Sequence, residues 1–374
     1  NAIKNKNLIL SKKIKTNILN EVFKKNFLRK NTIIKSASIN SKKIDKNSIF
    51  IGVKGKKYDG NFYVDEAFRN GAKLSITNKK FSNTKNIYNK NPINLFSTIS
   101  TRYRKSLNSN TIAITGSAGK TSVKELVGFC LNKLSKTYFS KNSFNNKYGV
   151  PLSIFNTPQE TKFVVLEAGM DKKGEIDYLT NLIKPNLGLI TNISYAHIKN
   201  FKNLNQIAEA KSELINNIIP GGILIINKDD KYFKYFSDKA KKKNLKVIFF
   251  SKKDKDANVV FLNQKKNKKN YIIKFKINNK IKSFLISKEL ASYKENILAC
   301  LSIIINYFDV EKLDKKIFTD FKIPKSRGSI INYKKRSKKI TIVDESYNSN
   351  PLSFKFALEK FDTNYINRSK KYLL

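Results

Sequence analysis

The chain has 374 residues, enough for two or three domains with hydrophobic cores of their own. Its 75 Lys and Arg residues against 28 Asp and Glu give a formal net charge of +47. The longest apolar run, Ile297 to Ile305, falls well short of the ~18 residues that a membrane-spanning helix needs, so membrane insertion is excluded.

The positive charge is spread along the whole chain and accompanies many Asn and Ile residues. A nucleic-acid-binding protein would combine it with an aromatic stacking surface or a recognition motif, and the sequence shows neither. A compositional bias of the whole chain explains the charge, and no nucleic-acid partner is expected. Anionic substrates would still be attracted to such a protein.

Cys130 and Cys300 are the only cysteines, and both lie in apolar patterns with helical spacing. They predict two buried thiols in a reducing compartment, and no Cys-x-x-Cys metal motif exists. The apolar cluster near the N-terminus, Leu8 to Leu10, is too short for the core of a signal peptide. We therefore expect a cytoplasmic protein.

Residues 1–105 form the first predicted domain, with a strand at Ser48 to Val53 and a helix at about Val64 to Asn70. The segment from Gly52 to Gly60 contains three glycines and three lysines. Such a segment suits contact with a phosphorylated ligand, although its spacing alone favours a solvated loop.

Residues 106–325 form the second predicted domain, in which apolar strands alternate with helices. Near-continuous apolar runs of this kind are typical of a parallel sheet covered on both faces. The predicted strands are Ile112–Ile114, Phe163–Leu166, Leu187–Ile190, Ile223–Ile226 and Val247–Phe250. Three antiparallel strands between Val259 and Ile286 and a helix from about Ser292 to Tyr307 follow.

The first of these strands leads into a glycine loop, and a helix begins near Lys120. Strand, glycine loop and Lys-Thr at a helix N-terminus form the arrangement that holds nucleotide phosphates: backbone N–H groups approach the oxygens, Lys120 supplies charge and Thr121 can bind Mg²⁺. The alternative is a chance glycine turn, which the strand and helix context disfavours. The loop residues are Gly116, Ser117, Ala118, Gly119, Lys120, Thr121 and Ser122.

Three further residues are candidates for chemistry. Glu167 ends an apolar strand, where a carboxylate beside a phosphate loop can hold Mg²⁺. His197, the only histidine, follows the next strand, and its position leaves a structural and a ligand role equally open. Lys211 lies in a helix with small neighbours, and spacing alone favours a solvated helix face.

Residues 326–374 begin a third predicted domain after Pro324. Ser329 to Tyr333 and Ile340 to Val343 predict a hairpin around a basic turn. The segment Asp344-Glu-Ser-Tyr-Asn-Ser-Asn-Pro351 comes next, and a helix is expected from about Leu352.

Together these segments resemble the Mur ligase family and, within it, the MurF branch. The resemblance runs from about residue 36 to 361. It is carried by Thr115–Glu125 (phosphate loop), Ser143–Pro151 (substrate-side asparagines), Glu167–Met170 with Gly174–Ile176, Ala196-His197, Ala210-Lys211 and Asp344–Pro351.

The resemblance implies an α/β protein of three domains with a central P-loop ATPase built on a parallel sheet. Residues 1–105 would bind the UDP end of the substrate, residues 106–325 would bind ATP, and residues 326–374 would start a Rossmann-like C-terminal domain. Residues 328 to 374 number only 47, whereas an independent domain has about 100–150, so we expect this third domain to be truncated.

The resemblance also implies the reaction, an ATP-dependent amide ligation in peptidoglycan precursor synthesis. ATP would phosphorylate the terminal carboxylate of UDP-N-acetylmuramoyl-tripeptide, and the amine of D-alanyl-D-alanine would attack the acyl phosphate. The alternatives are a MurE-like or folylpolyglutamate synthase-like specificity, or a basic P-loop NTPase that binds nucleic acid. A monomer is expected.

ATP and two Mg²⁺ ions are the implied cofactors. Thr121 and Glu167 would hold one ion, while His197 and a carbamylated Lys211 would hold the second; Lys120 would neutralise the γ-phosphate. A carbamate requires a neutral amine, which burial favours. The residues implied for ATP are those of the loop with Asn296, Arg327 and Asp344, and those implied for the substrates are Ser41, Lys42, Asn145, Asn146, Tyr347 and Asn348.

The chain departs from the family pattern at three places. Asn40-Ser-Lys42 stands where the family has Asp-Ser/Thr-Arg. A lysine cannot form the bidentate hydrogen bonds to a phosphate that an arginine forms. Ser292-Tyr293 stands where His-Asn is usual, ahead of Asn296. Ser326 replaces the first glycine before Arg327.

Overall fold

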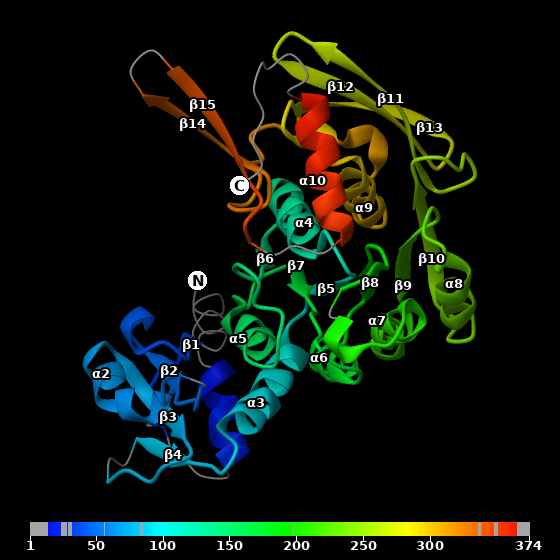
Figure 1. The fold of residues 1–374 in the computed structure, drawn as a ribbon. Coiled ribbons are helices and arrows are strands. Elements are labelled where there is room, and N and C mark those ends of the chain that lie inside the picture. Colours follow the sequence, from blue (N-terminus) through cyan, green and yellow to red (C-terminus); the bar gives the residue numbers. More distant parts are fainter. Residues whose placement is uncertain are drawn as a thin grey trace, which may run out of the picture. The chain divides into compact units, whose positions relative to one another are not determined.

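The computed structural model describes residues 14–23, 28, 32–55, 57–82, 85–196, 198–335, 338–347 and 351–364. Figure 1 shows the mixture of helices and strands. The chain divides into two compact units: a smaller one of Asn1–Thr111, Lys136–Ala168 and Tyr178–Lys184, and a larger one of Ile112–Ser135, Gly169–Asp177 and Pro185–Leu374. The three predicted domains, with boundaries after residues 105 and 325, stay a prediction.

The smaller unit contains a parallel sheet in the order β1-β2-β3-β4. Its strands are β1 (Ser36–Ser38), β2 (Ser48–Ile51), β3 (Ala72–Thr77) and β4 (Asn86–Tyr88). Its helical segments are 14–23, η1 (Ser41–Lys43), η2 (Gly60–Tyr63), α2 (Val64–Arg69), α3 (Pro92–Ser106) and α5 (Gly149–Asn156), with most of α6 (Glu175–Ile183). The same unit pairs β6 (Thr137–Phe139) with β7 (Phe163–Glu167) in parallel. The strand and the helix predicted between residues 48 and 70 are thus confirmed.

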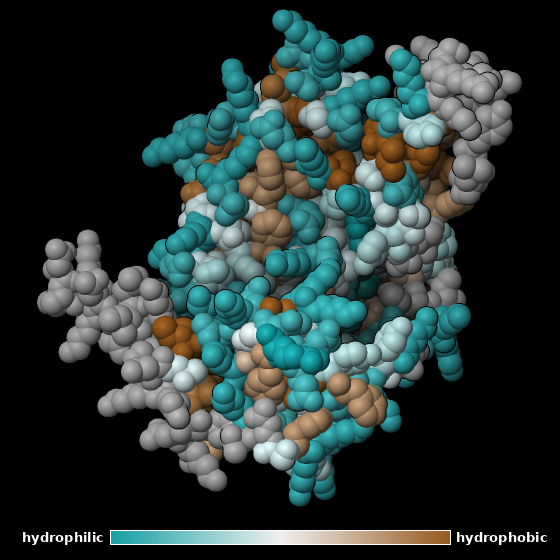
Figure 2. All heavy atoms as spheres, turned by 90° about the vertical axis from the view of Figure 1, so that its left-hand side faces the viewer, coloured by the Kyte–Doolittle hydropathy of each residue, from teal (hydrophilic) through white to brown (hydrophobic). Residues whose placement is uncertain are grey.

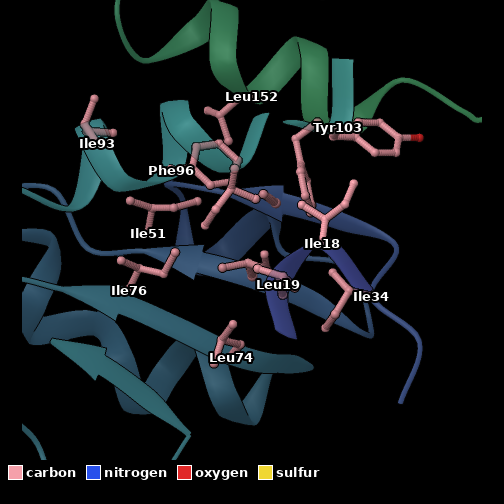
Figure 3. Packing of buried hydrophobic residues seen from close by; sticks show 14 of the residues in the cluster. Ile18, Leu19, Ile34, Ile51, Leu74, Ile76, Ile93, Phe96, Tyr103 and Leu152 are labelled. Atoms are coloured by element: carbon pink, nitrogen blue, oxygen red, sulfur yellow. The ribbon is translucent and has the colours of Figure 1, made fainter. Parts of the chain in front are cut away.

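The core of the smaller unit follows from the alternation of side chains along β2. Ile49 and Ile51 face a cluster that includes Phe96 of α3 and Leu152 of α5, and the labelled side chains of Figure 3 point into it. Phe50, between them, belongs to a second cluster with α2 on the other face. Because successive strand residues point to opposite faces, one apolar strand supports two helical layers.

The larger unit contains seven strands in the order β13-β12-β11-β10-β9-β8-β5. Strands β5, β8, β9, β10 and β11 run parallel, while β12 and β13 continue antiparallel as predicted. Their bounds are β5 (Asn110–Thr115), β8 (Leu187–Ile190), β9 (Ile223–Asn227), β10 (Lys246–Ser251), β11 (Val259–Asn267), β12 (Asn270–Ile277) and β13 (Lys280–Ser287).

The helices of the larger unit are α4 (Lys120–Leu134), α7 (Leu204–Asn217), α8 (Phe233–Lys241) and α9 (Lys294–Ile304), with 3₁₀ turns η3 (Ile198–Asn200), η4 (Leu290–Ser292) and η5 (Val310–Lys312). Helix α4 begins at the predicted residue and packs against α9. Cys130 on α4 and Cys300 on α9 are buried free thiols, as predicted.

The chain after Pro324 forms the predicted hairpin and helix. Strands β14 (Ser329–Lys335) and β15 (Lys338–Asp344) pair antiparallel, and α10 spans Pro351–Asn364. Helix α9 is shorter than the predicted 292–307, because a 3₁₀ turn precedes it and the chain leaves the helix after Ile304.

Hydrophilic side chains cover most of the face drawn in Figure 2, and apolar residues form separate patches on it. This distribution agrees with a positive charge that is spread over the sequence. Within the described residues, no helix combines the length and the apolar character needed to cross a membrane.

Lys15 is a buried cation in the smaller unit. Its ammonium group donates a hydrogen bond to the Lys35 carbonyl at 2.6 Å and lies 4.7 Å from the ring centroid of Tyr103 and 5.0 Å from that of Phe155. Burial lowers the pKa of Lys15 to about 8, although the Glu160 carboxylate raises it in part. Folding therefore disfavours the charged form of this side chain.

We expect Lys15→Met to remove a pH dependence of stability between about pH 8 and 10.5. Within that window the folded Lys15 has lost its proton while the unfolded lysine retains it, so stability rises with pH; below it the cost is fully present. The difference in free energy of unfolding between the two proteins should change by up to about 3 kcal/mol across the window. Urea denaturation at pH 7, 8.5 and 10 measures it. Lys73→Met, at an exposed position of β3, is the control, and an unchanging difference for Lys15→Met contradicts the assignment.

Candidate active site

The phosphate loop connects β5 to α4 and is shaped by two glycines with positive φ. Gly119 has φ +80° and stands at the N-cap of α4, while Gly116 has φ +143°. A Cβ atom at Gly116 would lie 1.9 Å from Oγ1 of Thr191. The loop is therefore pressed against the end of β8, and only glycine fits there.

The side chains of the loop concentrate polar groups at the start of α4. Lys120 arches back and donates to the Gly116 carbonyl at 2.8 Å. The hydroxyl-bearing residues Ser117, Thr121 and Ser122 are all buried. A lysine ammonium beside the positive end of a helix is an arrangement that can bind anions, and phosphate binding by this loop stays a prediction.

The segment Thr191–Ser194, directly after β8, holds this loop in place. Asn192 accepts from the Ala118 amide at 2.9 Å and its own carbonyl accepts from the Ser117 amide at 2.9 Å. Thr191 Oγ1 donates to the Ala118 carbonyl at 2.7 Å, and Ser117 Oγ donates to the Ser194 carbonyl at 3.0 Å.

These bonds change the expectation for the loop. The Ser117 and Ala118 amides donate to Asn192 of the 191–194 segment, so in this arrangement these two amides do not face a phosphate. The sequence alone had not indicated a role for this segment, which precedes His197 in the chain. Its signal was the pair Thr191-Asn192 at the carboxyl end of a buried strand, where ligand sites of parallel sheets lie.

Asp230, which sequence reasoning also missed, anchors the 191–194 segment from the turn after β9. Its carboxylate accepts from the Ile193 amide at 2.7 Å and from the Tyr232 amide at 2.9 Å. Burial raises the pKa of Asp230, while these two hydrogen bonds lower it in part. Asp230, after β9, thus supports the phosphate loop indirectly, because it holds the 191–194 segment that follows β8.

Lys211 is 1% exposed on α7, so the solvated helix face favoured by its spacing is wrong. The same helix carries Glu213, whose two carboxylate oxygens accept from the Gly174 amide at 2.7 Å and the Asp177 amide at 3.0 Å. Asn217 donates to the Asp177 carboxylate at 3.0 Å. One face of α7 is therefore buried with its polar groups and fixes the first turn of α6.

In the smaller unit, two predicted site residues meet. Glu167 ends β7, is 1% exposed, and accepts from Nδ2 of Asn145 at 2.7 Å. The neighbouring Asn146 accepts from the Tyr148 and Gly149 amides, both at 3.0 Å, and so organises the entry into α5. Asn145 orients the carboxylate, whereas Asn146 shapes the backbone.

The predicted UDP contacts, Ser41 and Lys42, lie in η1. Ser41 is buried, its hydroxyl donates to Glu66 at 2.5 Å and its carbonyl accepts from Asn70 at 2.9 Å. Lys42 is exposed. Ser41 therefore links η1 to α2, and Lys42 is the residue of this pair whose side chain can meet a ligand.

The residues outside the loop that are implied for ATP, namely Asn296, Arg327 and Asp344, lie in the larger unit. Asn296 Oδ1 is 3.5 Å from a Cβ position built on Gly119, so the first turn of α9 lies beside the phosphate loop. Arg327 stacks on the ring of Tyr347 at 4.0 Å. Asp344 accepts from the hydroxyls of Ser346 and Ser326, and these hydrogen bonds lower the pKa of Asp344.

His197 and Asn348 lie outside the described residues, so their roles stay predictions. Across the described positions, no group of three or more His, Cys, Asp or Glu side chains could hold a metal ion by itself. Mg²⁺ is commonly held by one or two protein ligands together with substrate phosphates. Glu167 in the smaller unit and Thr121 in the larger unit each carry a buried oxygen of the kind that this ion takes.

Comparisons with known proteins match most of the chain. The family profile described as "Mur ligase middle domain" matches residues 114–304. A protein of Buchnera aphidicola subsp. Baizongia pistaciae, named UDP-N-acetylmuramoyl-tripeptide--D-alanyl-D-alanine ligase, is 32% identical over 335 residues, which cover 87% of this chain and 70% of that protein.

Solved structures share the fold. MurF from Acinetobacter baumannii superposes with a TM-score of 0.79 at 22% identity, covering 92% of this chain and 75% of that one. MurF from Thermotoga maritima, solved in complex with ADP, gives 0.74 at 23% identity, covering 88% and 75%. The predicted α/β architecture is thereby confirmed.

We expect Gly116→Ala to destabilise the protein by about 1–3 kcal/mol more than Gly174→Ala does. Both glycines have positive φ, so both substitutions strain the backbone, but a Cβ at Gly174 meets nothing within 4 Å while one at Gly116 meets Thr191. Free energies of unfolding from urea titration give the comparison. Equal losses would show that the loop does not depend on its close approach to Thr191.

Proposed function

The chain belongs to the Mur ligase family, and we propose that it is the ATP-dependent ligase that adds D-alanyl-D-alanine to UDP-N-acetylmuramoyl-tripeptide. The observation that carries this proposal is the β5–loop–α4 element, with Lys120 folded over the loop, inside the region matched by the middle domain of the family. The name of the Buchnera relative, which aligns with 87% of the chain, supplies the substrates.

The proposed reaction has two steps. The γ-phosphoryl group of ATP is transferred to the terminal carboxylate of the tripeptide, which gives ADP and an acyl phosphate. The amine of D-alanyl-D-alanine then attacks the acyl carbon, inorganic phosphate leaves with the bonding electrons, and the new amide nitrogen loses a proton. Both steps bring anions together, so positive charge at the phosphates lowers the barrier.

Lys120 and the N-terminus of α4 supply that charge from the chain itself. The Lys120 ammonium already lies over the loop, at 2.8 Å from the Gly116 carbonyl, and can exchange this bond for one to a phosphate oxygen. The 191–194 segment and Asp230 hold the loop rigid, so little reorganisation is needed when charge develops.

ATP and Mg²⁺ are the cofactors that fit this arrangement, and the solved MurF of Thermotoga maritima contains ADP. Bound Mg²⁺ would neutralise and orient the phosphates. Thr121 and Glu167 are the ligands we propose for one ion, and His197 with a carbamylated Lys211 for a second. Lys211 is buried between Ala210 and Ser212. Burial favours a neutral amine, and CO₂ adds to a neutral amine with loss of a proton, so this position supports the carbamate.

The substrate contacts are proposed from the family resemblance. We propose Lys42 for the UDP end, Asn145 and Asn146 for the peptide near Glu167, and Tyr347 with Asn348 for the incoming dipeptide. Ser41 acts indirectly, since its hydroxyl is engaged by Glu66. The cytoplasmic location and the monomeric state stay predictions.

Lys120→Ala should reduce turnover about 10³-fold or more, because the charge that stabilises phosphoryl transfer is lost. The measurement is ADP release with UDP-N-acetylmuramoyl-tripeptide, in the presence and absence of D-alanyl-D-alanine. Lys136→Ala, which removes an exposed lysine paired with Glu160, is the matched control. A loss below tenfold for Lys120→Ala would mean that this loop is not the catalytic nucleotide site.

Lys211→Ala should abolish ligation, and short-chain carboxylates such as formate should restore part of it, because they replace the carbamate oxygens. Thermal unfolding of Lys211→Ala and of the larger Lys211→Met checks that the protein is still folded. Rescue is expected for the alanine variant alone, since methionine fills the space. Full activity of Lys211→Ala would remove the carbamate from the mechanism.

A further inference from the structure

Three polar side chains enclose the backbone of Gly328, just after Arg327. A Cβ atom built at Gly328, which has φ +85°, would lie 2.2 Å from Nζ of Lys360, 2.3 Å from the hydroxyl of Tyr293 and 2.6 Å from Oε1 of Glu345. The positive φ favours glycine at this position, and any Cβ here would push the three polar groups apart. We call these four residues the Gly328 junction.

The hydrogen bonds of the Gly328 junction have a fixed direction. Lys360 donates to the Tyr293 hydroxyl at 2.6 Å and lies 3.5 Å from the Glu345 carboxylate. Because an ammonium group has no lone pair, the Tyr293 hydroxyl must give its own proton elsewhere. It donates to the Arg327 carbonyl at 2.9 Å.

The Gly328 junction is charged and mostly buried, with Glu345 at its more exposed side (35% of its side chain). Tyr293 is 8% exposed and Lys360 is 7% exposed. Burial lowers the pKa of Lys360 and raises that of Glu345, so each charge depends on the other to stay ionised. Lys360 contacts the Tyr293 hydroxyl, the Glu345 carboxylate and the Gly328 carbonyl at once, so the positions of these groups are coupled.

The Gly328 junction connects Arg327 to the phosphate loop through the start of α9. Tyr293 is the residue before this helix, and Asn296, three residues later, lies beside Gly119. One helical turn therefore contacts both the loop and the Arg327 backbone. The Arg327 side chain extends from this fixed backbone and stacks on Tyr347.

We propose that Tyr293, oriented by Lys360 and Glu345, is a positioning residue for Arg327 in nucleotide binding. Tyr293 occupies one of the two positions where the family pattern usually has His-Asn, and here it contacts the Arg327 backbone. The inference rests on the proposed function, in which Arg327 contacts ATP. In this proposal Tyr293 acts through the arginine, because its hydroxyl bonds to the Arg327 carbonyl.

The test measures the Kd of Mg-ADP by calorimetry on the full chain, so it needs no ligase turnover. Tyr293→Phe removes one hydroxyl and should raise Kd about three- to tenfold, the effect of one hydrogen bond. In the Arg327→Ala background the same substitution should change Kd less than twofold. Tyr178→Phe, which removes the bond from that hydroxyl to Ser97, is the control.

A purely structural role for Tyr293 would lower Tm and leave Kd unchanged, or would raise Kd by the same factor with and without Arg327; either result overturns the proposal. Lys360→Met keeps the aliphatic chain and removes the donor to Tyr293, so it should raise Kd in the same range. If the unaltered chain bound no Mg-ADP, the proposed function itself would fail. If the unaltered chain bound Mg-ADP and Tyr293→Phe left Kd unchanged, only the positioning role of Tyr293 would fail.

Discussion

The close approach of Gly116 to Thr191 is the constraint on which the nucleotide side of this protein depends. It brings the end of β5 against the end of β8 with no side chain between them. The 191–194 segment can then bond the Ser117–Ala118 backbone, while Lys120 at the start of α4 donates to the Gly116 carbonyl of the same loop. A larger residue at position 116 would separate the two strand ends and open the loop.

The phosphate loop is held by a series of contacts, each of which depends on the one before it. Asp230 fixes Ile193, the 191–194 segment fixes Ser117 and Ala118, and the loop fixes the start of α4. The first two steps use the half-buried side chains of Asp230 and Asn192, whose oxygens accept from backbone amides. The groups that we propose to meet the phosphates therefore need little further ordering.

The formal net charge of the chain is +47, and its buried charged side chains interact with groups close to them. Glu213 satisfies two amides at the first turn of α6, Glu345 and Lys360 face each other, and Lys15 lies over two aromatic rings. The excess of lysine is carried mainly by exposed positions. The same residue type thus serves as a solvated surface group and, at Lys211 and Lys360, as a buried side chain.

The sequence by itself determined the strand-loop-helix of the nucleotide site, the parallel strands from β5 to β10, the hairpin β14–β15 and the family. These features depend on local chemistry: β-branched runs, glycines that permit positive φ, and Lys-Thr at a helix start. Only the tertiary structure decided which side chains meet across the fold. The burial of Lys211, the bond from Asn145 to Glu167, and the supporting roles of Asn192, Asp230 and Tyr293 join residues that are far apart in the chain. Spacing along one element cannot reveal them, because whether a polar residue faces solvent or a partner depends on what the rest of the chain packs against it.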